Sequence, residues 1–218
     1  MIDSRPSLRH EFVGMMFAVA VGAVGLQAAG LVRSGPWMGN LPAYSHLLLA
    51  TIVIATSWVG WSRSVAPGAR KDVKGIFEWE FVVLLLDVAL VVLYFILVGT
   101  IDFSENTHRR VDPESSVSQW LLWIFVLYLA WDMVTKIAIR DETWPKVFSR
   151  VAPTVICVVV LTLLWVHFSR ANVVPQITAD LALLFVVLGF RAVKGQANQV
   201  RWALVCLGGF ILACLLTK

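Results

Sequence analysis

Seven long apolar runs dominate the sequence, and basic residues are unevenly shared among the segments between them. Most runs approach the roughly 20 apolar residues that an α-helix needs to cross a hydrocarbon core of about 30 Å. We predict membrane spans at 12–32, 43–61, 80–101, 117–137, 151–169, 177–191 and 202–217. The pattern predicts an all-α, polytopic helical bundle of about seven transmembrane helices, folded as one domain over residues 1–218.

The basic residues predict the orientation of these spans. With a cytoplasmic N-terminus, 13 of the 18 Lys and Arg fall inside: Arg5, Arg9, Arg63, Arg70, Lys71, Lys74, Lys136, Arg140, Lys146, Arg150, Arg191, Lys194 and Arg201. The other 5 fall outside: Arg33, Arg109, Arg110, Arg170 and Lys218. Cytoplasmic loops carry an excess of Lys and Arg, so we expect the N-terminus inside and the C-terminus outside.

Composition favours an integral membrane protein over a soluble one. Hydrophobic residues make up 59% of the chain and charged residues 15%, whereas a soluble domain carries about 25% charged residues. We expect the bacterial inner (plasma) membrane, with the lipid bilayer as the first partner. The net charge of +4 is scattered over several cytoplasmic segments, so nucleic-acid binding is not expected.

Two segments indicate contacts with other helices or proteins. Gly14, Ala18 and Gly22 recur at four-residue spacing in the first run, and small residues at that spacing let helix backbones approach closely in lipid. We expect this span inside the bundle or at the interface of a homo-oligomer or partner membrane protein. The basic loop 62–79 is the expected site for a cytoplasmic partner.

Charged residues inside spans are the main candidates for function, because each costs about 2.5–3.5 kcal/mol on insertion scales. Asp87 is the deepest of them, and Glu80, Asp87 and Tyr94 are spaced by seven, close to two helical turns, so they share roughly one face. An acidic entrance, a buried acid and a phenol predict a path for a cation or proton.

Asp132 and Lys136 lie four residues apart in the fourth run. Such a pair either forms a local ion pair or places Asp132 in the same cavity as Asp87. By topology His46, His167 and Asp180 lie toward the outer leaflet, where they could form a gate or proton relay, because histidine titrates near neutral pH. The alternative is that the histidines are interfacial residues.

No motif indicates an enzyme, a metal site or a cofactor. The sequence contains no GxSxG, HExxH, GxxxxGK[ST] or GxGxxG, and its three cysteines lie in spans without metal-binding spacing. A retinal protein needs a buried lysine in its last helix, whereas the only Lys near the last run is Lys218. The segment SWVGWS at 57–62 is distinctive but indicates no mechanism.

The sequence therefore favours a non-enzymatic channel, pore or small transporter for ions or protons. The alternative is an accessory or anchoring subunit of a larger complex, including an effector that depolarises the membrane in stress or defence. An intramembrane enzyme using the histidines is a weaker alternative. The last two spans are short, and Arg191, Arg201 and Lys218 are expected to reach toward lipid headgroups. Substrate, direction, trigger and stoichiometry are not indicated.

Overall fold

The computed structural model describes residues 8–33, 40–64, 75, 77–100, 114–139, 143–170, 175–194 and 208. Within these ranges the chain is helical and has no strand. The elements are α1 (Leu8–Arg33), α2 (Leu41–Ser64), α3 (Trp79–Gly99), α4 (Glu114–Val134), the π-helical turn η2 (Thr135–Ile139), α5 (Trp144–Arg170) and α6 (Gln176–Val193). The all-helical prediction is confirmed for the described part of the chain.

Five helices are long and apolar enough to span a membrane: Glu11–Arg33, Leu41–Ser62, Trp79–Gly99, Ser116–Ile137 and Arg150–Arg170. They coincide with the first five predicted spans, and we treat the chain as an integral membrane protein. Helix α6 covers the predicted sixth span and extends it to 18 residues. The seventh predicted span, 202–217, lies outside the described residues except for residue 208.

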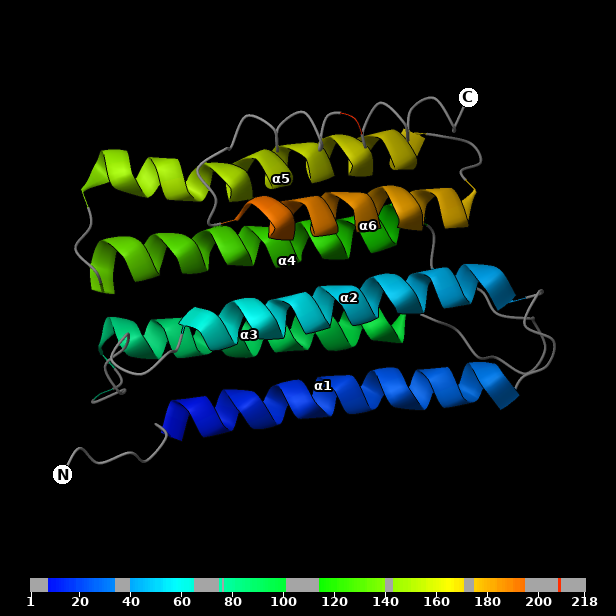
Figure 1. Cartoon of the computed structure of the whole chain (residues 1–218), viewed down its shortest axis with the longest axis horizontal. Coiled ribbons are helices and arrows are strands. Elements are labelled where there is room, and N and C mark those ends of the chain that lie inside the picture. The colour runs from blue at the N-terminus through cyan, green and yellow to red at the C-terminus, as the bar shows by residue number, and fades with distance from the viewer. Residues whose placement is uncertain are drawn as a thin grey trace.

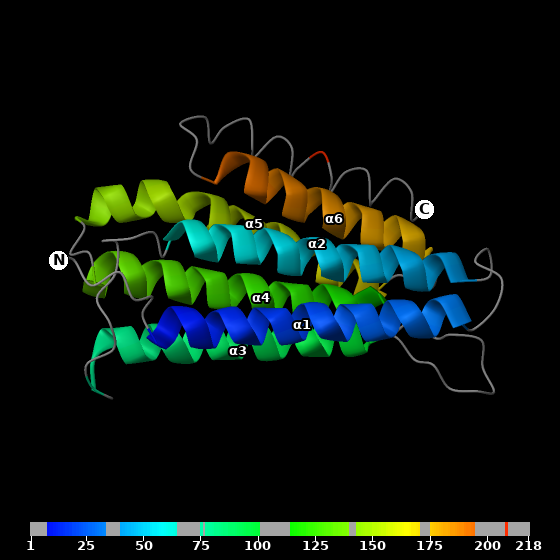
Figure 2. The ribbon, with the colours of Figure 1, turned by 60° about the horizontal axis from the view of Figure 1, so that its bottom comes forward.

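The helices lie side by side along one common axis and alternate in direction (Figure 1). Helix α4 packs between α3 and α5, α6 packs mainly on α2, and α1 contacts α2 and α3. The view in Figure 2 shows the same parallel arrangement from another side. Alternating directions are expected for successive membrane spans, and they bring the beginnings of α2 and α6 to the same end as the end of α3.

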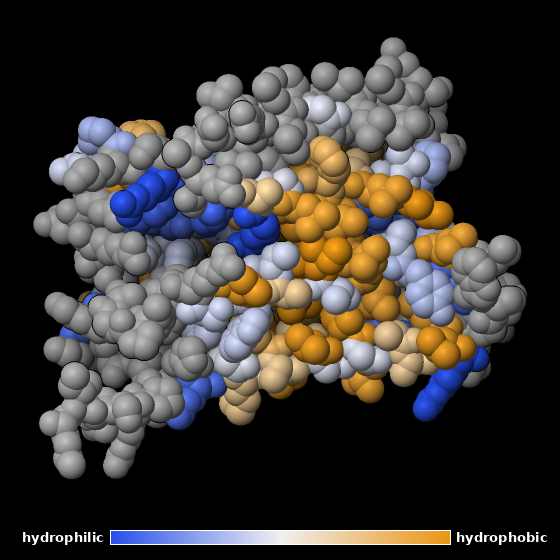
Figure 3. Space-filling view, viewed as in Figure 1, coloured by the Kyte–Doolittle hydropathy of each residue, from blue (hydrophilic) through white to orange (hydrophobic). Residues whose placement is uncertain are grey.

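Apolar side chains face outward as well as inward. Met15, Leu26 and Val159 are 60%, 78% and 53% exposed, and Figure 3 shows apolar residues gathered in the middle of the visible face. An apolar pocket of about 370 Å³ lies between α4 and α5, lined by residues such as Met133 and Val155. A soluble protein rarely leaves such a surface uncovered, whereas lipid tails cover it without cost.

Helix α1 lies at the edge of the bundle, so of its two expected positions the one inside the bundle is wrong and the one at an interface stays a prediction. A side chain on Gly14 would meet Trp58 of α2 at 3.6 Å, but nothing lies within 4 Å of such a position on Gly22, and Ala18 is exposed. Phe17 makes the inward contact instead, 5.2 Å from Trp58 and 5.8 Å from Tyr94 between ring centroids. The rest of the small-residue face points outward.

Candidate functional site

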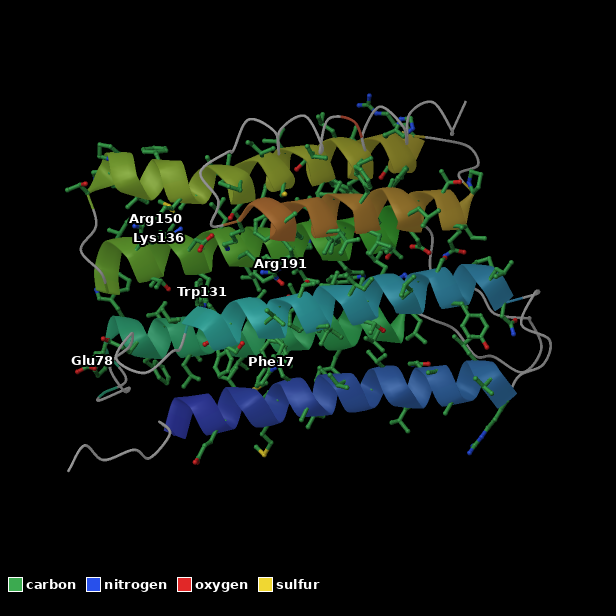
Figure 4. The ribbon with its side chains drawn as sticks, viewed as in Figure 1. Phe17, Glu78, Trp131, Lys136, Arg150 and Arg191 are labelled. Carbon is green, nitrogen blue, oxygen red and sulfur yellow. The ribbon has the colours of Figure 1, made fainter. Side chains whose placement is uncertain are left out.

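Polar side chains gather inside the bundle at three levels along its axis. One cluster joins the beginnings of α2 and α6 to the end of α3, a second lies near the middle, and a third lies toward the other end. We call these the first, central and third clusters. Arg191 is nearer the middle of the bundle than Trp131, Lys136 and Glu78 (Figure 4).

The first cluster joins three helices through His46 and Asp180, which are 0% and 3% exposed. Nδ1 of His46 lies 3.7 Å from Oδ1 of Asp180, and Ser45 Oγ donates to Asp180 Oδ2 at 2.6 Å. Nε2 of His46 lies 2.8 Å from the Leu97 carbonyl oxygen and 2.6 Å from Thr100 Oγ1. The structure thus brings together two of the three residues grouped by topology.

The hydrogen bonds of His46 bear on the enzymatic alternative. A carbonyl oxygen only accepts, so the contact with Leu97 requires a proton on Nε2. With Nε2 as the donor to Leu97, the Thr100 hydroxyl donates to the same carbonyl oxygen, and the cluster joins α2, α3 and α6. His167 lies in the last turn of α5, with its ring 5.8 Å from that of Phe168.

The central cluster forms around Arg191. Its Nη2 donates to Ser57 Oγ at 3.0 Å and to Tyr128 Oη at 3.1 Å. The hydroxyls of Tyr128 and Tyr94 are 2.9 Å apart, and Ser57 also hydrogen-bonds Tyr128. Four helices, α2, α3, α4 and α6, therefore meet at one charged group.

The placement of Arg191 corrects the expectation that it reaches toward headgroups. Its guanidinium carbon lies 5.1 Å from the centroid of the Tyr128 ring and 5.2 Å from that of Phe190. A Cβ atom on Gly60 would lie 2.7 Å from Nη1, closer than real Cβ contacts. Glycine therefore leaves room for the guanidinium, and Ser57, one helical turn earlier, accepts its hydrogen bond.

Sequence reasoning missed this cluster although both signals were present. The segment SWVGWS supplies Ser57 and Gly60, and Arg191 ends the sixth apolar run. Neither signal is specific alone, because an arginine at the end of a span usually lies at the interface. Only the packing of α6 on α2 shows that the two signals belong together.

The third cluster forms around Asp132, which is 2% exposed. Lys194 Nζ donates to Asp132 Oδ2 at 3.0 Å, and Thr154 Oγ1 donates to the same oxygen at 2.9 Å. Lys136 Nζ lies 3.5 Å from Oδ1. Lys136 belongs to the π-helical turn η2 that follows α4, and such turns are frequent at functional sites.

Asp87 lies in the same half of the bundle, on the buried face of α3 that also carries Tyr94. Its Oδ1 accepts a hydrogen bond from Trp131 Nε1 at 2.8 Å. Glu80, at the beginning of α3, is only partly buried. Two members of the predicted stripe are therefore interior, and the third is at its end.

An apolar layer separates the first cluster from the central one. Every residue between Asp180 and Arg191 is apolar or glycine, and eleven residues of helix correspond to about 16 Å. The layer is made of buried apolar residues of α6 and of the neighbouring α2 and α4: Leu49, Ala50, Val53, Ile54, Leu121, Ile124, Phe125, Leu183, Val186 and Val187. Between Tyr128 and Asp132 the separation along α4 is only about 6 Å.

No protein-family model, curated protein or solved structure matches this chain. The chemistry of the site therefore has to be argued from its own residues. Among the described residues, no group of three or more His, Cys, Asp or Glu could hold a metal ion. The described interior instead offers carboxylates, lysines, an arginine and hydroxyls, groups that bind ions and carry protons.

Proposed function

We propose that this protein is a small ion-conducting membrane protein, a channel or a proton-linked transporter. The observation that carries the proposal is the position of the charged groups: Asp87 and Asp132 are buried between helices, and Arg191 hydrogen-bonds two neighbouring helices. An interhelical hydrogen bond in a membrane contributes only about 0.6 kcal/mol on average, whereas inserting a charge costs about 2.5–3.5 kcal/mol. Charged groups inside membrane spans are therefore rare, and they usually mark ion or proton pathways.

In this proposal the polar groups line a path for ions, and one apolar layer closes that path. Polar groups extend from the third cluster to Arg191, and the apolar layer then blocks the way to His46 and Asp180. In the proposed orientation, with the N-terminus cytoplasmic, the polar half opens inward and the pair His46–Asp180 lies on the outer side. Opening requires the layer to separate, and a movement of α6 against α2 would do this.

The proposal is tested by ion flux in proteoliposomes, under an imposed voltage and across a pH gradient. Asp87→Asn keeps the shape of the side chain and an oxygen for Trp131 but removes the charge. We expect this variant to reduce flux at least about tenfold, a typical effect of losing a proton-transfer group. The matched control is Glu11→Gln, an exposed carboxylate in the first turn of α1, which is expected to conduct like the wild type.

A second candidate function, an accessory subunit of a membrane complex, is favoured by one observation. Ala18 and Gly22 of α1 face outward, where another helix or a second copy can pack closely. The loop 62–79, proposed to contact a cytoplasmic partner, lies largely outside the described residues. Well-folded protein without flux at any voltage or pH would contradict the conduit and favour this second function.

A further inference from the structure

Arg191 differs from the other interior cations in its surroundings. Lys136 and Lys194 share the carboxylate of Asp132, but no described carboxylate lies within ion-pair distance of Arg191. Its Nε is buried, without a hydrogen-bond partner in the described part of the chain. The two groups that do contact its Nη2 are neutral hydroxyls.

The sequence limits where a counterion could come from. No Asp or Glu follows Asp180. The carboxylates that the structure does not describe are Asp3, Asp72, Asp102, Glu105, Asp112, Glu114, Asp141 and Glu142. In the sequence all of them lie before or between the predicted spans. No carboxylate within a predicted span is therefore left to pair with Arg191.

We propose that Arg191 binds a small planar oxyanion, such as nitrate or a short carboxylate. Arg191 is partly buried and its Nε is fully buried; a charge held in a low-dielectric medium without a counterion is costly, and a bound anion lowers that cost. The rings of Tyr128 and Phe190 pack near the guanidinium, and its N–H donors point along its edge, as bidentate binding of a planar oxyanion requires. The hydroxyls of Tyr94 and Tyr128 lie beside the guanidinium and hydrogen-bond each other, while Ser57 donates to the Val53 carbonyl.

The surrounding charge favours anions over cations at this position. Lys194 caps the end of α6, three residues after Arg191. Together with Lys136, these cations outnumber the carboxylates of Asp87 and Asp132 across the central and third clusters. Positive charge lining a low-dielectric path raises the local concentration of anions. The inference names the ion class of the proposed conduit and, as a statement about transport, rests on that proposed function.

The test measures binding separately from flux. The thermal unfolding midpoint of the detergent-solubilised full-length protein is followed against sodium nitrate and sodium formate, at constant ionic strength with a bulky sulfonate as the balancing anion. A ligand that binds only the folded state raises the midpoint with concentration. We expect a saturable rise for wild type, an affinity at least about tenfold weaker in Arg191→Gln, and a wild-type response in Arg170→Gln, which changes an exposed arginine.

If Arg191→Gln does not fold, Arg191→Lys is used to test anion binding instead. This variant keeps the charge but loses the planar fork, so it is expected to weaken nitrate and formate more than chloride. The inference is overturned if wild type shows no saturable response, or if Arg191→Gln or Arg191→Lys responds like wild type to nitrate and formate. Binding without flux contradicts the conduit alone, whereas Asp87-dependent flux without Arg191-dependent binding contradicts the anion site alone.

Discussion

At the scale of single residues, the interior depends on one glycine. Gly60 makes room for the guanidinium of Arg191, because a Cβ atom there would lie 2.7 Å from Nη1. The clash would involve the end of a flexible side chain, so the arginine can move away at small cost. Substitution should therefore disturb the position of the charge more than the stability of the fold.

Gly60→Ala is expected to change stability by less than about 1 kcal/mol, since gained helix propensity offsets the two lost hydrogen bonds. Nitrate binding should weaken at least about tenfold, a loss of about 1.4 kcal/mol, as the guanidinium leaves Ser57. The matched control is Gly25→Ala, a helical position with nothing within 4 Å, expected to stabilise by about 0.5–1 kcal/mol with unchanged binding. Unfolding in mixed micelles and the nitrate titration measure both effects, and normal nitrate binding by Gly60→Ala would contradict the assignment.

At the scale of elements, α6 is held at three points along its length. Asp180 ties its beginning to α2, Arg191 ties its second half to α2 and α4, and Lys194 joins its end to Asp132 of α4. Asp132 also accepts from Thr154 of α5. A single carboxylate thus links α4, α5 and α6, and two lysines lie within ion-pair distance of it.

Asp132→Asn should destabilise the folded protein by up to about 3–5 kcal/mol, the cost of breaking a buried ion pair, because it removes the carboxylate shared by Lys136 and Lys194. Lys194→Met should cost less, because Lys136 still pairs with the carboxylate. In the double variant the two effects should be non-additive, as expected for groups in one network. Reversible unfolding in mixed micelles provides the three values, and equal costs for both single variants would show that Asp132 is not shared.

At the scale of the whole molecule, the charge asymmetry and the alternating helices predict one orientation. Residues between α3 and α4 face outward if the N-terminus is cytoplasmic. The C-terminus then faces outward after seven crossings and inward after six. The side of the membrane on which the C-terminus lies therefore shows whether the run 202–217 crosses it.

Labelling of single cysteines with a membrane-impermeant maleimide tests this topology. In a background with Cys157, Cys206 and Cys214 replaced by alanine, we expect Ser104→Cys and Lys218→Cys to react in intact cells. Ser4→Cys should react only after permeabilisation. Reaction of Ser4→Cys in intact cells would reverse the orientation, and protection of Lys218→Cys together with exposure of Ser104→Cys would reduce the crossings to six.

The helices were predicted well from the sequence because the length of an apolar run, and the Gly and Pro residues between runs, are local properties of the chain. The prediction placed five spans within a few residues of the apolar spans in α1–α5, although α5 itself begins seven residues earlier, at Trp144. It also selected Asp87 and Asp132 as candidates, because a charge inside a span is visible without a structure. The contacts of Arg191 and Lys194 were not predictable, since both residues follow an apolar run and look interfacial. The outward small-residue face of α1 likewise depends on which neighbours α1 meets, and helical spacing alone does not specify them.

The apolar layer between Arg191 and the pair His46–Asp180 has a consequence for electrical behaviour. A transmembrane voltage falls mainly across the least polarisable part of a path, and moving one elementary charge through the full drop changes the energy by about 2.3 kcal/mol per 100 mV. An anion that reaches Arg191 from the polar half crosses little of this drop, so its occupancy there should depend weakly on voltage. Its exit across the layer moves the charge through most of the field, which makes that step the voltage-sensitive one.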